Sequence, residues 1–235
     1  MTSLRPQSLV AKITDRLSHE ILSGAYQSLG LLPTEQKLIL KYRVSRTVVR
    51  EATKQLVSRG LAEIHHGLGV KIVNCLHRPL TQSLGFRLPN IKDRLEKLME
   101  VRLLVEPAAA RLAAKRATPH HLKVLREIQG RLVAASNASE AAEFDLQFHR
   151  VLSQAAGNEV IELMLESVAD LGCKSREVTI SKVGPERAFE HHKQILVAIE
   201  ERDAQAAERA MEKHLEVAAL DLQQYFKTTA GSRRK

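Results

Sequence analysis

The sequence predicts a mostly α-helical protein, in which an N-terminal winged helix-turn-helix domain is joined to a C-terminal all-helical bundle. Three observations favour this fold class. Aliphatic residues dominate the 44% hydrophobic content while aromatic residues make up only 3%, which favours helices. Residues 44–52 have the pattern of the last helix of a helix-turn-helix. Residues 91–225 have helical periodicity almost throughout.

Two helices are expected near the N-terminus. Apolar residues recur at every fourth position across residues 9–23, and Gly24 follows as a stop. The second helix opens after Thr34, whose hydroxyl suits an N-cap, and Glu35 suits the positive end of the helix dipole. The turn into the third helix then runs through residues 42–44.

The third helix is expected to have one buried and one exposed face. Ser45 is a natural N-cap. Three residues at helical spacing would face a small core, namely Val49, Ala52 and Leu56. Three others fall on the opposite side, namely Arg46, Thr47 and Arg50. Because the two arginines are four positions apart, both project near the helix start, where recognition helices contact guanine edges and phosphates.

Residues 61–73 are expected to form two short strands around a glycine-rich tip, which is the shape of a wing. Gly67 and Gly69 would let the backbone approach a groove closely, and His66 at the tip could reach a phosphate or the minor groove. The alternative interpretation is a plain hairpin without DNA contact.

The positive charge is concentrated in the N-terminal third of the chain. Residues 1–78 hold 12 Lys and Arg against 5 Asp and Glu, whereas residues 79–235 hold 24 against 22. The excess therefore coincides with the predicted helix-turn-helix, and it indicates a double-stranded DNA partner, because phosphate neutralisation drives most sequence-independent affinity. A basic domain that is merely soluble is the alternative.

The rest of the chain divides into a linker, a bundle and a tail. We assign residues 1–75 to the DNA-binding domain, 76–92 to a linker or short docking helix, 93–228 to the bundle and 229–235 to a disordered tail. The helical pattern breaks near five places, which predicts about six helices: residues 118–119, 136–139, 157–158, 184–185 and 203.

Cysteine content and hydropathy favour a cytoplasmic protein. Cys75 and Cys173 are far apart and suggest neither a disulfide framework nor a thiolate zinc site. No apolar run approaches the roughly 20 residues of a membrane span, and the N-terminus lacks the apolar stretch of a signal peptide. We therefore expect no membrane association.

Four polar residues fall on predicted apolar faces of three helices of the bundle. Asp145 and His149 are four apart on one helix, while His192 and His214 lie on the apolar stripes of two others. Imidazole and carboxylate together suit zinc, nickel, manganese or iron, with one or two positions left for water or a ligand oxygen. The alternative is that each histidine is a hydrogen-bonded core residue. His191 is the alternative to its neighbour His192, although the stripe favours the latter.

Arg102 also points partly inward, since it follows the apolar residues of its helix at helical steps. A buried arginine requires an anion. One interpretation is a salt bridge to Glu106 or Asp145, and the other is a bidentate clamp on the carboxylate of an effector. Three further candidates for the pocket wall are better explained as a helix cap and solvated charges, namely Asn158, Lys174 and Arg176.

Taken together, these segments resemble the bacterial GntR transcription regulators. The N-terminal resemblance runs over residues 9–73, through the segments 21–24, 32–35, 44–52 and 60–61 and the two wing glycines. The remainder resembles the FadR-type (FCD) effector domain, through the segments 100–102, 106–108, 145–149 and 157–158. Three departures lie in the DNA-binding part: Gln36 replaces a usual arginine, Arg43 replaces a usual turn glycine, and Val48 replaces a common threonine, where it could contact a thymine methyl.

The resemblance implies a homodimer that binds a pseudo-palindromic operator. It implies DNA contacts from six residues: Ser45, Arg46, Thr47, Arg50, His66 and Gly67. It implies a divalent metal, with zinc preferred, on Asp145, His149, His192 and His214. It also implies a small organic or sugar-acid effector that reaches the metal, with Arg102 and Asn158 as candidate contacts.

The sequence thus predicts a ligand-responsive transcription regulator, a repressor by default, and not an enzyme. One alternative is a metal-dependent hydrolase, because a metal with an open position can activate water. No Glu lies beside a predicted ligand as in H-E-x-x-H. A hydrolase would also not explain why the N-terminal domain is basic. The other alternative is a regulator whose metal is purely structural.

Overall fold

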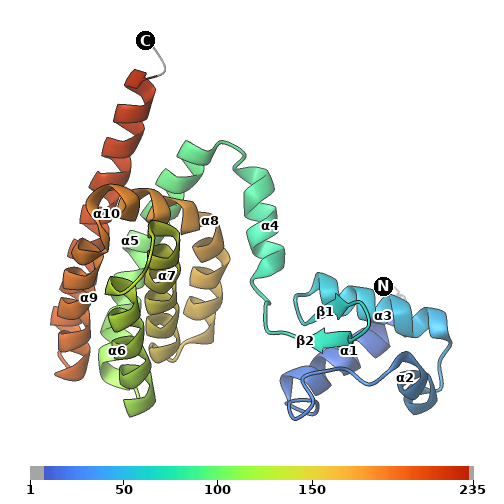
Figure 1. Ribbon diagram of the computed structural model, residues 1–235. Coiled ribbons are helices and arrows are strands. Elements are labelled where there is room, and N and C mark those ends of the chain that lie inside the picture. The colour runs from blue at the N-terminus through green and yellow to red at the C-terminus, as the bar shows by residue number, and fades with distance from the viewer. Residues whose placement is uncertain (1–7, 233–235) are drawn as a thin grey trace, which may run out of the picture. The chain divides into compact units, whose positions relative to one another are not determined.

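The computed structural model describes residues 8–232 of the chain, which form two compact units that divide between Gln82 and Ser83 (Figure 1). The predicted fold class is confirmed. Outside the helices, the described residues contain one two-stranded sheet, and it belongs to the first unit. Each unit has its own cluster of buried apolar side chains.

Three helices make up most of the first unit: α1 (Leu9–Leu22), α2 (Glu35–Tyr42) and α3 (Arg46–Ser58). Both predicted N-caps form, because the hydroxyls of Thr34 and Ser45 accept hydrogen bonds from main-chain N–H groups of the first turns of α2 and α3. Between these helices, Arg43 adopts a left-handed backbone with φ of 52°. This conformation explains why a glycine suits the position.

The buried face of α3 is the predicted one. Val49, Ala52 and Leu56 have no exposed surface, and they pack with residues of α1 that include Leu17, which is also fully buried. Arg46, Thr47 and Arg50 lie on the exposed side. The apolar face therefore holds α3 on the unit and leaves its polar face to solvent.

The wing consists of β1 (Ala62–His65) and β2 (Gly69–Ile72), which pair antiparallel with His65 opposite Gly69. The outer edge of β2 is also paired, because Leu32 N–H donates to the Val70 carbonyl at 2.8 Å and Ile72 N–H donates to the Gly30 carbonyl at 2.9 Å. The segment before α2 therefore fixes the hairpin to the unit on the side that would otherwise be an open sheet edge.

Gly60, between α3 and β1, is required by its surroundings. Its φ is +75°, and a Cβ at this position would lie 2.0 Å from the carbonyl oxygen of Cys75. The approach is close because Cys75 N–H donates to the Gly60 carbonyl at 2.8 Å, where the chain leaves the wing. A side chain here would force the main chain apart.

A helix occupies most of the segment expected to be a linker. The short-helix alternative describes it, since α4 (Arg78–Arg87) spans the division between the two units. The next helix begins at Ile91, where the side-chain oxygen of Asn90 accepts from the N–H groups of Lys92 and Asp93.

The described part of the second unit contains six long helices (Figure 1). They are α5 (Ile91–Arg116), α6 (Pro119–Val133), α7 (Ala138–Ala155), α8 (Glu159–Val183), α9 (Pro185–Glu200) and α10 (Ala204–Ser232). Their ends coincide with the five breaks predicted from the sequence. Proline at the first position and an N-cap threonine or glycine explain the starts of α6 and α9.

The expected disordered tail over residues 229–235 is wrong for its first part. Helix α10 continues to Ser232, and residues 233–235 lie outside the described residues. The Thr228 hydroxyl donates to the Gln224 carbonyl one turn earlier, and no proline follows to break the helix. The helix therefore continues beyond the last residues of the periodic apolar pattern, from which the start of the tail was predicted.

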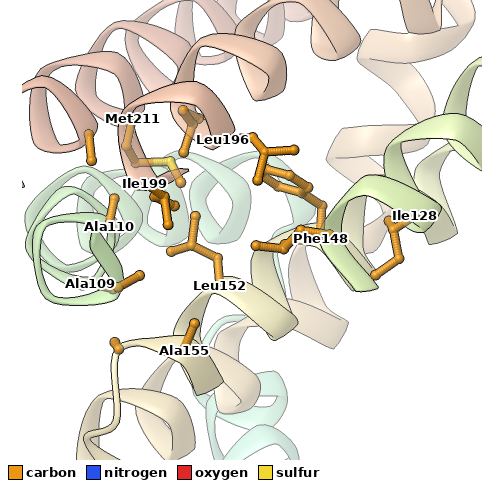
Figure 2. Close-up of a cluster of buried hydrophobic side chains, with 14 of the residues drawn as sticks. Ala109, Ala110, Ile128, Phe148, Leu152, Ala155, Leu196, Ile199 and Met211 are labelled. Atoms are coloured by element: carbon orange, nitrogen blue, oxygen red, sulfur yellow. The ribbon is translucent and has the colours of Figure 1, made fainter. Parts of the chain in front are cut away.

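The apolar core of the bundle is built from all six of these helices, α8 contributing Leu165 and Ile180. Figure 2 shows Phe148 and Leu152 of α7 among side chains of the other helices, including Leu196, Ile199 and Met211. Four alanines of α5 are fully buried and give the neighbouring helices room to approach: Ala109, Ala110, Ala113 and Ala114. None of the described helices is apolar over the length that a bilayer crossing requires.

We expect Gly60→Ala to destabilise the first unit by about 3 kcal/mol, because left-handed strain adds to a clash with main chain. Gly30→Ala is the matched control, since Gly30 also has a positive φ of +60° but nothing within 4 Å of its added Cβ. It should cost only about 1 kcal/mol. Calorimetry of the full chain measures both changes, and equal costs would show that the Cys75 contact is not what restricts this position.

Candidate metal centre and DNA-binding surface

The four predicted metal ligands converge in the interior of the bundle. Asp145 and His149 come from α7, His192 from α9 and His214 from α10. One donor atom from each side chain lies within 4.8 Å of every other, and all four residues are buried. Three helices thus bring one carboxylate and three imidazoles to one point.

Helix geometry and packing position these side chains. The spacing of four puts Asp145 and His149 on one face of α7. The ring of His192 has no exposed surface and stacks on Phe148, with centroids 3.9 Å apart and an angle of 4° between the planes. Its orientation is therefore restricted by an apolar contact, and the alternative His191 is not part of the cluster.

The imidazole nitrogens are poorly satisfied by the protein itself. Nε2 of His149 and Nε2 of His214 face each other at 3.2 Å. No hydrogen bond reaches either ring nitrogen of His192, although its Nε2 lies 3.4 Å from Oδ1 of Asp145. Buried polar atoms without partners are costly. A cation among these nitrogens would satisfy them, so the donor set fits a divalent metal.

Glu106 of α5 lies against one of the candidate ligands. Its Oε2 lies 2.6 Å from Nδ1 of His149, and its Oε1 accepts from Nε of Arg102 at 2.5 Å. With Nδ1 directed at a carboxylate, Nε2 of His149 is left for the cluster, as in many metal sites with a supporting carboxylate. Arg102 is thus engaged with Glu106, which is the first of its two predicted interpretations.

Arg176 of α8, which the sequence offered only as a weaker candidate for the pocket wall, belongs to the same cluster. Its Nε donates to Oδ2 of Asp145 at 2.8 Å, and only 5% of the residue is exposed. The expectation of a solvated charge is wrong because Asp145, 31 residues away, supplies a buried counter-ion. No hydrogen bond reaches its Nη1.

Two of the candidate ligands, Asp145 and His192, have charges that suit metal binding. Burial alone would raise the pKa of Glu106, but Arg102 and His149 hold it well below its usual range. Burial opposes ionisation of Asp145 as well, yet His149 and Arg176 lower its pKa. Burial, with neighbouring positive charge, lowers the pKa of His192. Carboxylates are thus ionised and this imidazole is neutral at neutral pH, as metal ligands must be.

A cavity opens beside the cluster, lined by α5, α7, α8, α9 and α10. Arg102, Asp145, Arg176 and His214 line it, and it encloses about 540 Å³ counting its open mouth. Asn158, a candidate effector contact, does not line it. Its side-chain oxygen instead accepts from Val160 and Ile161 N–H at the start of α8, so the helix-cap interpretation describes it.

The six candidate DNA contacts are all exposed. Ser45, Arg46, Thr47 and Arg50 lie at the start of α3, and His66 and Gly67 lie between the two strands of the wing. Nε of Arg50 donates to Oε1 of Glu35 at 2.9 Å on the surface, a pair that is weak enough to open for a phosphate or a base. Gln36 is exposed too, where it offers no charge.

Each of the two units matches a known family of protein domains. Residues 9–72 match the family described as bacterial regulatory proteins, gntR family, and residues 97–217 match the FCD domain. The chain is 30% identical over 215 residues to the HTH-type transcriptional regulator LutR of Bacillus subtilis, which covers 88% of this chain and 97% of that protein. It is also 30% identical over 206 residues to the galactonate operon transcriptional repressor of Escherichia coli, covering 85% and 90%.

A solved structure has the same fold over nearly its whole length. The GntR protein of Streptococcus agalactiae superposes with a TM-score of 0.71 at 31% identity, covering 90% of this chain and 99% of that one. Its similarity extends over both units and is well above the level at which only the fold is shared. The chain therefore belongs to the GntR family of bacterial transcription regulators, in the group that carries an FCD domain.

Proposed function

We propose that this regulator binds a divalent metal, with zinc preferred, and a small carboxylate or sugar-acid effector in its bundle, and that the effector changes its affinity for an operator. The observation that carries the proposal is the convergence of Asp145, His149, His192 and His214 within 4.8 Å. Four protein ligands leave one or two positions for an oxygen of the effector.

The chain's own residues prepare the site in three ways. Glu106 lies beside Nδ1 of His149, so that Nε2 is the nitrogen left for a metal. Arg176 balances the charge of Asp145, and the stack on Phe148 fixes His192. A bound cation would supply a positive centre for an anionic ligand. Since Arg102 and Arg176 line the cavity at its side, they add positive charge where a carboxylate would enter.

The first unit supports operator binding. It holds the basic excess of the chain, and it exposes two arginines at the start of α3. We expect a homodimer on a pseudo-palindromic site in the bacterial cytoplasm, with repression relieved by the effector, as the name of the galactonate operon repressor suggests for that relative. The coupling is reciprocal, so operator DNA must change effector affinity by the same factor.

The proposal differs from its two alternatives in what the site can do. A hydrolase needs a base for the attacking water, but the second buried carboxylate of the described cluster, Glu106, is held by Arg102 and His149. A purely structural metal would stabilise the fold without any response to acids. Turnover of an added acid would favour the hydrolase, and zinc-dependent stability without an acid response would favour the structural metal.

His192→Ala and His214→Ala should each lower the metal content of the purified protein severalfold, because each removes one of the proposed ligands. Mass spectrometry of metals in the purified protein measures the content. His191→Ala is the matched control, since His191 lines the cavity and adjoins His192 but lies outside the cluster. Full occupancy in both ligand variants would mean that other residues bind the metal. Both variants should still bind DNA.

Arg46→Ala should weaken binding to an operator selected from random-sequence DNA, by about 1 to 3 kcal/mol if a bidentate base contact is lost. Fluorescence anisotropy at several salt concentrations measures the change. Arg209→Ala removes the same charge from an exposed position of α10 in the other unit and should have little effect. Unchanged operator affinity of Arg46→Ala would refute the assignment of this face of α3.

A further inference from the structure

We propose that the cavity beside the cluster takes a short monocarboxylic acid with an apolar body, and that Arg176 holds its carboxylate. This inference rests on the proposed function, which allows either a simple carboxylic acid or a sugar acid, and it selects the first of these. Two independent features support it, namely an unused donor on an arginine that lines the cavity and the chemistry of the remaining wall.

Arg176 lines the cavity and has a buried donor to spare. Its Nε is used by Asp145, but no hydrogen bond reaches Nη1, although only 5% of the residue is exposed. A buried guanidinium nitrogen without a partner is costly, and a carboxylate would satisfy it with a charge-assisted hydrogen bond. Arg102, by contrast, already uses its Nε on Glu106 and brings Nη2 within 3.5 Å of Nε2 of His149.

The wall away from the cluster is largely aliphatic. Side chains from three helices contribute to it: Met99, Ile180, Val183, Val217, Ala218 and Leu222. None of them can donate or accept a hydrogen bond of useful strength. A ligand body that lies against them gains by being apolar, and each hydroxyl that it buries there loses its hydration without compensation.

The polar residues of the wall are mostly engaged with one another or with the main chain. The hydroxyl of Ser175 donates to the Gly172 carbonyl at 2.7 Å, and that of Thr179 donates to the Ser175 carbonyl at 3.0 Å. Arg187 and Asp221 form an ion pair at 2.9 Å.

His191 is the exception, because no hydrogen bond reaches its Nδ1. One imidazole nitrogen can satisfy one polar group of a ligand. Each further hydroxyl of a sugar acid would have to share polar groups that are already engaged or lie against the aliphatic wall, whereas a simple 2-hydroxy or 2-oxo acid would not suffer this loss.

Two acids of six carbons separate the two ligand classes. Both 2-hydroxyhexanoate and gluconate carry a carboxylate and a 2-hydroxyl, and gluconate differs by hydroxyls along the rest of its chain. Calorimetric titration of the zinc-loaded full chain should give an affinity for 2-hydroxyhexanoate that is higher by about tenfold or more. Equal or tighter binding of gluconate would overturn the inference while leaving the proposed function standing.

The role of Arg176 is tested by Arg176→Gln, which should weaken 2-hydroxyhexanoate by about tenfold to a hundredfold. Arg150→Gln is its matched control, because Arg150 also forms an Arg–Asp pair between α7 and α8, to Asp170, but does not line this cavity. If the two variants bind 2-hydroxyhexanoate with equal affinity, Arg176 does not bind the carboxylate. Metal content is measured in each variant to separate loss of the acid from loss of the metal.

A second variant protects the test against misfolding of Arg176→Gln. Val217→Thr puts a hydroxyl on the aliphatic wall at nearly constant shape and should weaken 2-hydroxyhexanoate by about threefold or more while leaving gluconate unchanged or tighter. Val197→Thr, on an exposed part of α9, is its control. If neither acid binds a protein that holds zinc, the inference fails alone; if no zinc binds either, the proposed function fails with it.

Discussion

The balance of buried charge around Asp145 is the constraint on which the bundle depends. Its interior holds two carboxylates, two arginines and three histidines, each of which would be costly in isolation. They are arranged as two connected chains, in which Arg102 binds Glu106 beside His149, and Arg176 binds Asp145. Five helices contribute polar side chains to this balance. A change in the packing of any of them would therefore also change the geometry of the site.

The same arrangement explains how a sensor can respond to a small ligand. A cation and a carboxylate would each alter the charge balance that five helices share, so either event acts on the packing of the whole bundle. The first unit is built differently. Its network of Glu20 with Lys41, Tyr26 and Tyr42 ties α1 to α2 and lowers the pKa of Glu20 against the effect of burial. That network stabilises a scaffold and leaves the cationic face of α3 to solvent.

Sequence periodicity predicted what depends on local structure. The helix breaks of the bundle, the caps Thr34 and Ser45 and the inward faces of Asp145 and His192 all follow from spacing and turn chemistry. Arg176 and the link from Glu106 to His149 did not follow, because each has its partner on another helix, far away in sequence. Asn158 is a local case, because the sequence favoured a helix cap at this position over a pocket contact, and its side chain caps α8.

The central claim is that the four converging side chains are a metal site. Anomalous diffraction from crystals of the zinc-supplemented protein, recorded on both sides of the zinc absorption edge, tests it most directly. We expect one strong peak inside the bundle, bonded to Asp145, His149, His192 and His214. A peak elsewhere on the protein, or a cluster in which those residues are joined only by hydrogen bonds and water, would contradict it.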